Sequence, residues 1–353
     1  MRTLLVGGLA LVAHISVGCA QQPMQQHEVS KDHPRLLGDQ ARLQALKAER
    51  PQAYERMANV ARDTNADKHS RIMSLSLVSA IDGDATLARE AVDLAMTHVN
   101  GDIKQGHVTF AHDLAQVAIA YDLCYDAWTD AERAKAIEYI NATVDANVRS
   151  ESHVFHNGWY GYKYWGEGLA AYATYYENPR AKEILDVLYN DYNSRAAPAL
   201  ELAGAGGGWA EGYYIHYWLY EWLFFCEVAR FCEGIDLYET APSFYRNRAI
   251  ASMFEVYPGI GIYNSRRSIP MGDGGGITFG GDRDKTVNAR RMLVNRYGDD
   301  AAHQAAHAFN ELTPRTAVGN YAYKDFLWRD ESVTQADLAE FKLSHISEGP
   351  GYV

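Results

Sequence analysis

Two short segments of this sequence combine aromatic rings with groups that donate or accept protons. The first is His156-Asn157-Gly158-Trp159-Tyr160, and the second runs from Gly206 to Tyr217 with the sequence GGGWAEGYYIHY. Tyrosine and histidine can transfer protons, and asparagine can donate hydrogen bonds to a developing negative charge. Aromatic rings offer flat faces on which a sugar can stack. The two segments therefore predict a carbohydrate site.

The composition is that of a globular protein with an acidic balance. The chain has 353 residues, of which 47% are hydrophobic and 12% aromatic, and its formal net charge is −12. This is enough chain for one large core or two domains. No long basic run is present, which argues against nucleic acid as a partner. A polyanion would need a local basic patch, for which the candidates are Lys163, Arg266, Arg267, Arg283, Lys285, Arg290 and Arg291.

Residues 1–19 have the pattern of a lipoprotein-type signal peptide. Arg2 supplies the positive end, an apolar stretch follows, and Ser16-Val17-Gly18-Cys19 resembles a bacterial lipobox. The apolar stretch is too short to span a membrane. We therefore expect export to the periplasm, with an outer-membrane lipid anchor at Cys19 as the one membrane contact and residues 20–32 as a polar tether. Because Ser16 is not the usual aliphatic residue, cleavage by ordinary signal peptidase is the alternative.

The other three cysteines are Cys124, Cys226 and Cys232. They lie in apolar surroundings and form no CxxC pair, so we expect buried thiols. No zinc-ligand spacing is present, and the sequence predicts neither a metal nor a cofactor.

Hydrophobic spacing with the period of a helix continues through most of the chain, so the sequence predicts an all-α fold built from helical hairpins. Many consecutive hairpins suggest an α/α toroid or another curved array. The glycine-rich segment 257–284 breaks this pattern and predicts a loop that is functional or mobile. The expected helices are 39–62 with a break at Pro51, 69–81, 86–99, 107–128, 130–148, 159–176, 181–192, 212–233, 241–257, 285–297 and 300–309.

Several short motifs follow one another in an informative order. They are His33-Pro34-Arg35-Leu36-Leu37, Tyr121-Asp122-Leu123 with Trp128 to Arg133, His156-Asn157, Gly168 to Tyr172, and Trp209 to Gly212 ahead of a tyrosine cluster. In this order and spacing, residues 33–353 resemble the heparinase II/III-like polysaccharide lyases. The resemblance implies an incomplete α/α toroid over residues 33–340. It also implies that residues 341–353 begin a truncated β-sandwich domain.

The reaction implied by the resemblance is β-elimination at a uronic acid of an acidic polysaccharide. A base removes the C5 proton beside the carboxylate, and the O4 leaving group departs with a proton. His156 and Asn157 suit neutralisation of the developing charge, although Asn157 also suits the N-cap of the next helix. The resemblance places the proton-transferring tyrosine just past Glu211-Gly212. Tyr214 is our first choice, followed by Tyr213 and then Tyr217.

The remaining candidates would hold the substrate. Trp159, Tyr160 and Trp209 could stack on sugar rings, and Arg266 and Arg267 could bind a uronate or sulfate through paired hydrogen bonds. Glu211 could orient His156 or a sugar hydroxyl, or be a first-turn acid favoured by the helix dipole. His216 could be a supporting donor or a buried, satisfied histidine.

Two other functions remain open. A glycoside hydrolase needs two carboxylates flanking the scissile bond, for which Glu211 with Asp273 or Asp113 could be invoked. A non-catalytic, surface-anchored glycan-binding lipoprotein is the second alternative.

Overall fold

The computed structural model describes residues 27–106, 109–147, 154–156, 159–212, 214–260, 266–269, 271, 284–312, 322–342 and 344–353. These residues are mostly helical, which confirms the all-α prediction. The first half contains α1 (Gln40–Glu49), α2 (Pro51–Arg62), α3 (Lys68–Asp82), α4 (Ala85–Val99), α5 (Thr109–Leu123), α6 (Asp130–Asn147), the π-helix η2 (Trp159–Gly168) and α7 (Leu169–Ala173). The second half contains α8 (Ala181–Asp191), α9 (Ala197–Ala203), α10 (Ile215–Glu233), α11 (Pro242–Phe254), α12 (Asp284–Tyr297), α13 (Ala301–Glu311) and α14 (Ala322–Trp328).

Local signals in the sequence set many of these helix ends. The Asp39 side chain accepts a hydrogen bond from the Arg42 backbone N–H at 2.8 Å, which caps α1. Pro51 then starts α2, as the predicted break requires. At the other end of a helix, Gly83 adopts φ +70° and ends α3 in the left-handed conformation that glycine tolerates. Caps of this kind explain why the predicted ranges lie close to the observed ones.

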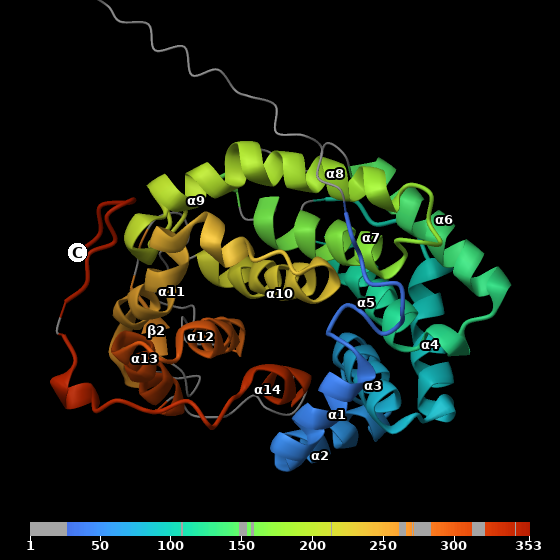
Figure 1. Ribbon diagram of the computed structural model, residues 1–353, viewed down its shortest axis with the longest axis horizontal. Coiled ribbons are helices and arrows are strands. Elements are labelled where there is room, and N and C mark those ends of the chain that lie inside the picture. Colours follow the sequence, from blue (N-terminus) through green and yellow to red (C-terminus); the bar gives the residue numbers. More distant parts are fainter. Residues whose placement is uncertain are drawn as a thin grey trace, which may run out of the picture.

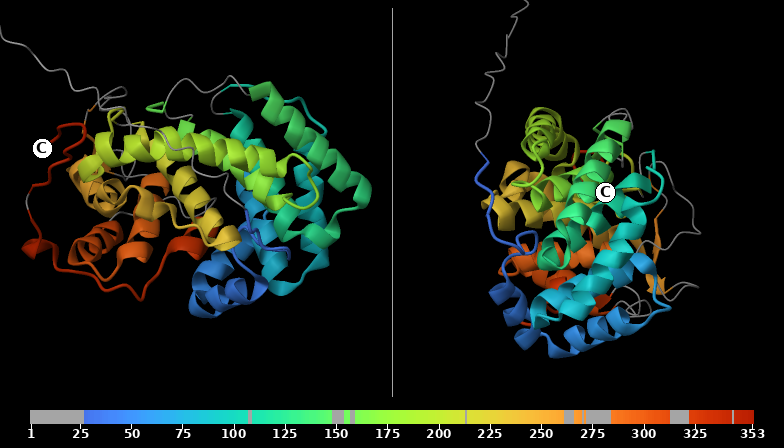
Figure 2. Two further views of the ribbon diagram at one scale, coloured as in Figure 1. Left: turned by 45° about the horizontal axis from the view of Figure 1, so that its top comes forward. Right: turned by 90° about the vertical axis from the view of Figure 1, so that its right-hand side faces the viewer.

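The helices follow one another along a curved path (Figure 1). In both views of Figure 2, α8 and α9 lie at one edge of the molecule and α1 and α2 at the opposite edge. At the end of the path, α14 packs against α2 and α3. Arg50 donates to the carbonyls of Phe326 and Leu327 at 3.0 and 2.8 Å, so the early and late helices are joined directly.

The longest helix of the second half, α10, is buried on nearly every side. Its buried residues include Leu223, Phe224 and Val228 together with polar groups such as Glu221. A helix that is apolar almost all round must lie inside a large core. Within the described residues, Cys124, Cys226 and Cys232 are buried free thiols, as the sequence predicts. None of the described helices combines the length and the apolar character needed to cross a membrane.

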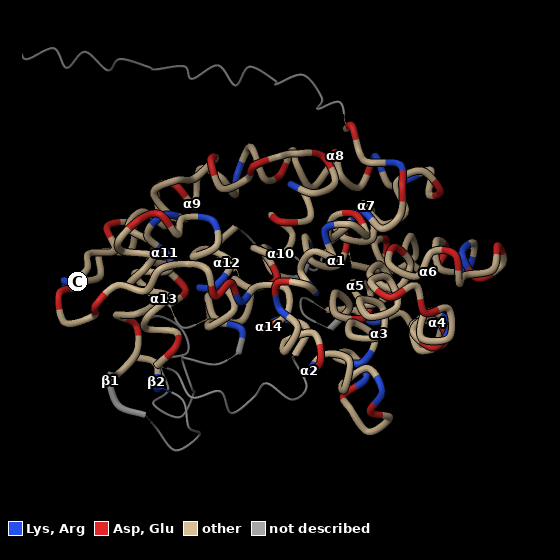
Figure 3. The backbone as a smooth tube through the Cα atoms, turned by 60° about the horizontal axis from the view of Figure 1, so that its bottom comes forward, with Lys and Arg blue, Asp and Glu red and all other residues tan. Residues whose placement is uncertain are grey.

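The glycine-rich segment is partly extended. Strand β1 (Val256–Ile260) pairs antiparallel with β2 (Arg266–Ser268), with Val256 opposite Ser268. The sequence did not predict this hairpin, nor helices α9 and α14. Acidic and basic residues are scattered over the described part of the chain, as Figure 3 shows.

Both ends of the described chain pack onto the helices. Residues 27–32, part of the predicted tether, lie against the end of α10, where the His27 ring donates to Glu233 at 2.8 Å. Near the other end, Ser347 N–H donates to the Tyr352 carbonyl at 2.8 Å and closes a tight turn. The His345 ring donates to the Gly206 carbonyl at 2.6 Å, so this turn lies on the glycine loop that precedes α10.

A close helix crossing leads to the first testable expectation. A methyl group added at Gly161 would lie 2.4 Å from Cβ and 2.7 Å from Cα of Trp218, because η2 crosses α10 at backbone distance. We expect Gly161→Ala to destabilise the fold by about 1–3 kcal/mol, since the helices cannot separate without losing contacts. The urea midpoint of unfolding measures this. Gly101→Ala is the control, because its added methyl group meets no atom closer than 3.2 Å. Equal effects of the two variants would contradict the explanation.

Candidate functional site

The turn before α10 positions the second aromatic segment. Gly212 adopts φ +64°, and its N–H donates to the Trp209 carbonyl at 2.9 Å. The Ile215 N–H then donates to the Gly212 carbonyl at 3.1 Å. Because Gly212 is left-handed, the helix cannot run through it, and α10 begins at Ile215 rather than at the predicted residue 212.

Buried aromatic rings hold the two predicted segments together. Tyr160 at the start of η2 stacks on Trp218 of α10, with ring centroids 4.6 Å apart. Trp209 meets the edge of Tyr160 at 5.4 Å. Tyr160 and Trp209 expose 0% and 1% of their surface. Their rings therefore contact protein rather than solvent, and they align the two segments instead of offering a face to a sugar.

His156 lies half-buried in the turn that precedes η2. Its neighbour Phe155 is exposed, and the Phe155 ring contacts Trp209 at 5.6 Å. The first segment thus contacts the second one at Trp209, two residues before the half-buried Glu211. The role of His156 beside the start of α10 stays a prediction.

Tyr214 and Tyr217 form a pair at the first turn of α10. Their rings lie 5.4 Å apart and both residues are half-buried, so part of each phenol reaches solvent. Lys285 of α12 donates to the Tyr217 carbonyl at 3.0 Å and lies 2.5 Å from Glu221. A helix N-terminus and an ammonium group together favour an anion at this place.

A histidine-rich cluster on helices α3, α4 and α5 consists of His69, His98, His112 and Asp113. The His112 ring of α5 stacks on His69 of α3, with centroids 6.2 Å apart. Burial lowers the pKa of His112 to about 4, against the opposing charge of Glu221. His112 is therefore neutral at neutral pH, and it interacts electrostatically with His69 and with the Glu221–Lys285 pair.

Asp113 is the acidic member of that cluster. Burial would raise its pKa, but His69, His98 and Lys104 outweigh burial and hold the pKa well below its usual range. A general acid must carry a proton at the working pH. The ionised Asp113 therefore suits only the base or nucleophile role of a hydrolase pair, which would leave the acid role to Glu211.

His216 points away from the tyrosine pair into the core. Its Nδ1 lies 3.1 Å from the Thr286 hydroxyl, and its Nε2 lies 3.8 Å from Glu255. Burial lowers the pKa of His216 to about 4. The structure thus places it as a buried, satisfied histidine, one of the two interpretations that the sequence leaves open.

The buried His216 predicts a pH dependence of stability. Its folded pKa lies below the ordinary value near 6.5, so the unfolded chain binds more protons between about pH 4 and 6.5. The contribution of the neutral His216 to the free energy of unfolding is therefore fully present above pH 6.5, and it is lost as the pH falls toward 4. In urea unfolding between pH 7 and 5, we expect His216→Gln to flatten the slope by up to about 1.36 kcal/mol per pH unit.

Other histidines limit how far that slope can flatten. Burial also lowers the pKa values of His303, His307 and His345, so they act in the same direction. The substitution should therefore reduce the slope without abolishing it. An unchanged slope in His216→Gln would show that this ring does not carry the effect.

The two candidate arginines lie on β2 and differ in exposure. Arg266 is buried, and its guanidinium packs over the Phe309 ring at 4.2 Å. Arg267 is half-buried on the other face of the strand. Of the two, Arg267 is the better placed to meet a solvent-borne carboxylate or sulfate.

Some predicted site residues lie outside the described part of the chain. These are Cys19, Asn157, Tyr213, Asp273 and Arg283, and the side chain of Trp159 belongs with them.

The sequence interpretation missed His69, His98, His112 and Glu221. Each lies on a helix whose main signal is its apolar spacing. A His112-Asp113 pair inside the apolar start of α5 is the one local signal that could have drawn attention to the cluster. The other members are 14 or more residues away from this pair, and only the fold brings them together.

Comparison with known proteins adds no family assignment. The sequence matches no protein-family model, and no curated protein matches it significantly.

Proposed function

We propose that this protein is a polysaccharide lyase that cleaves a uronic-acid-containing polysaccharide by β-elimination, on a helical domain that is an incomplete α/α toroid. The observation that carries the proposal is the Tyr214–Tyr217 pair, two half-buried phenols at the positive end of α10. Uronate elimination needs a proton-transferring group beside a place that favours a carboxylate. The tyrosine pair with Lys285 offers both.

Each residue has a part in the proposed reaction. Tyr214, in its ionised form, takes the proton from C5 and then gives it to the departing O4, and Tyr217 lies beside it. His156, together with Asn157, donates to the carboxylate as charge develops on it. Lys285 supplies positive charge at the helix start, although Glu221 offsets part of it.

The resemblance to the heparinase II/III-like lyases supports the same reaction from the sequence side. It rests on motif order, and it places the catalytic tyrosine where the half-buried pair lies. The order of the sequence motifs and the half-buried tyrosine pair are two separate observations in support of the same reaction.

The proposal is tested by incubating the chain with alginate, glycosaminoglycans and other uronans. Elimination leaves an unsaturated sugar that absorbs in the near ultraviolet, and hydrolysis leaves none. We expect new absorbance with at least one uronan. New reducing ends without absorbance would identify a hydrolase instead. Glycan binding without any cleavage would identify a binding protein and would equally overturn the proposal.

A further inference from the structure

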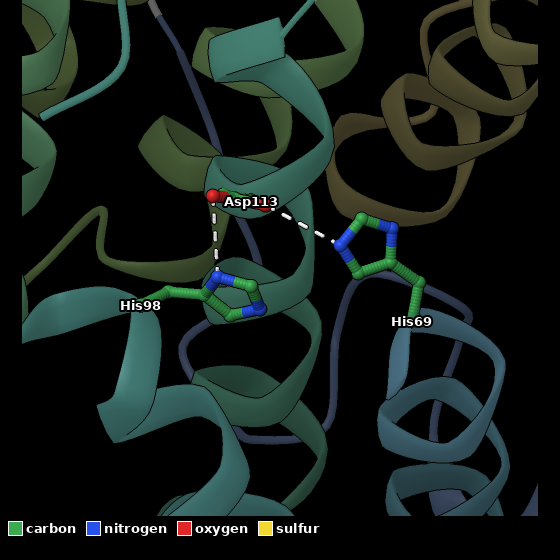
Figure 4. A group of neighbouring side chains, drawn as sticks. All are labelled: His69, His98 and Asp113. Atoms are coloured by element: carbon green, nitrogen blue, oxygen red, sulfur yellow. Dashed lines mark ion pairs between the residues drawn. The ribbon is translucent and has the colours of Figure 1, made fainter. Parts of the chain in front are cut away.

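Three helices direct potential metal ligands toward one point (Figure 4). His69 comes from the first turn of α3, His98 from the last turn of α4 and Asp113 from the first half of α5. Their ligand atoms all lie within 4.8 Å of one another. The Asp113 carboxylate is central, because its Oδ1 lies 3.3 Å from His69 Nε2 and its Oδ2 lies 3.2 Å from His98 Nδ1.

These separations fit ligands around an ion better than strong hydrogen bonds. Charge-assisted N–H···O bonds are typically about 2.7–2.9 Å long. Ligands placed about 2.0–2.1 Å from a tetrahedral Zn²⁺ lie roughly 3.3 Å from one another. The two N–O separations, one to each oxygen of Asp113, lie close to that edge length.

A second, independent observation concerns the Asp113 oxygen that faces His69. This Oδ1 is buried, and apart from the long 3.3 Å ion pair with His69 Nε2 it makes no hydrogen bond within the part of the chain that the structure describes. One long ion pair compensates a buried carboxylate oxygen only weakly for its lost hydration. A bound cation would lie closer to this oxygen and would bind the His69 nitrogen as well.

Lys104 competes for the same carboxylate. Its Nζ lies 2.6 Å from Asp113 Oδ2, and its side chain is 50% exposed in the loop after α4. An exposed lysine can swing into solvent at little cost, whereas His98 and Asp113 are fixed in the core. The ammonium therefore occupies a place where a divalent cation would be held more firmly.

We propose that His69, His98 and Asp113 bind one divalent transition-metal ion of the Zn²⁺ class. Two imidazole nitrogens and one carboxylate favour such an ion over Ca²⁺ or Mg²⁺, which prefer all-oxygen sites. Three protein ligands leave a fourth position, and the 39% exposure of the His69 side chain gives water access to it. The ion ties together α3, α4 and α5. This proposal does not depend on the lyase reaction.

The test titrates the full chain, first freed of metal with a chelator, with Zn²⁺ alone. We expect one equivalent to bind and to raise the thermal unfolding temperature. Binding should weaken at least 100-fold in His98→Ala and in Asp113→Asn. His303→Ala is the matched control, because His303 is a buried histidine of α13 outside the cluster. Binding of the two cluster variants at parental affinity would overturn the proposal.

Two further measurements avoid variants that could fail to fold. Lys104→Met removes the competing ammonium at an exposed position, so we expect Zn²⁺ to bind several-fold more tightly than in the parent. Co²⁺ added to the parent chain should give the visible absorption of a tetrahedral nitrogen and oxygen site. Absence of stoichiometric binding in both the parent and Lys104→Met would show that Asp113 only forms ion pairs.

Discussion

Tyr214→Phe is expected to lower kcat on a cleaved uronan by on the order of 10²–10⁴-fold, the range typical for loss of a proton-transferring group. Phenylalanine keeps the ring that contacts Tyr217 at 5.4 Å and removes only the hydroxyl. KM should change little, because the ring surface that meets the substrate remains. Initial rates of near-ultraviolet absorbance measure both constants.

Tyr217→Phe is the matched control for that variant. It removes the same hydroxyl from a half-buried residue three positions along the same helix. We expect a smaller loss of kcat than in Tyr214→Phe. A larger loss of kcat in Tyr217→Phe than in Tyr214→Phe would assign the proton transfer to Tyr217. Parental activity in both variants would mean that neither tyrosine transfers the proton.

Arg248→Met is expected to destabilise the fold by about 3–5 kcal/mol, because it leaves a buried charge without its partner. Arg248 is 1% exposed, and it binds both carboxylate oxygens of Glu255, one of them at 2.8 Å. It also donates to the Gly207 carbonyl at 2.5 Å in the loop before α10. The free energy of unfolding from urea titration measures the loss.

The double variant Arg248→Met, Glu255→Met separates the charge effect from the packing effect. Removing both members of a buried ion pair often costs little, whereas removing one costs much. We therefore expect the double variant to recover much of the stability lost by the single one. A single variant that loses less than about 1 kcal/mol would contradict this account of the pair.

The sequence predicts the helices well where a local signal marks their ends. Asp39, Asp67 and Asp84 each cap a helix, and their side chains accept hydrogen bonds from backbone N–H groups of the first turn. Pro51 and Gly83 mark a start and an end. Helix α14 was not predicted, because its seven residues carry too short a pattern to count as periodic.

The candidate site was only partly predictable. The two aromatic segments could be paired, because both carry large rings beside a helix start, and buried rings do hold them together. Residue type alone cannot show which ring is buried, so Tyr160 and Tyr214 looked alike in the sequence. The cluster of His69, His98 and Asp113 depends on three helix ends meeting, which no pattern within a single helix encodes.

The contact between α14 and the helices α2 and α3 has a consequence for how the molecule unfolds. In an open array of hairpins, the terminal units fray first, since each has one neighbour fewer. Here Arg56 of α2 pairs with Asp325 of α14, and Arg50 reaches the carbonyls at the end of the same helix. Helices α2 and α14 therefore cover each other, so that loosening either one exposes the other.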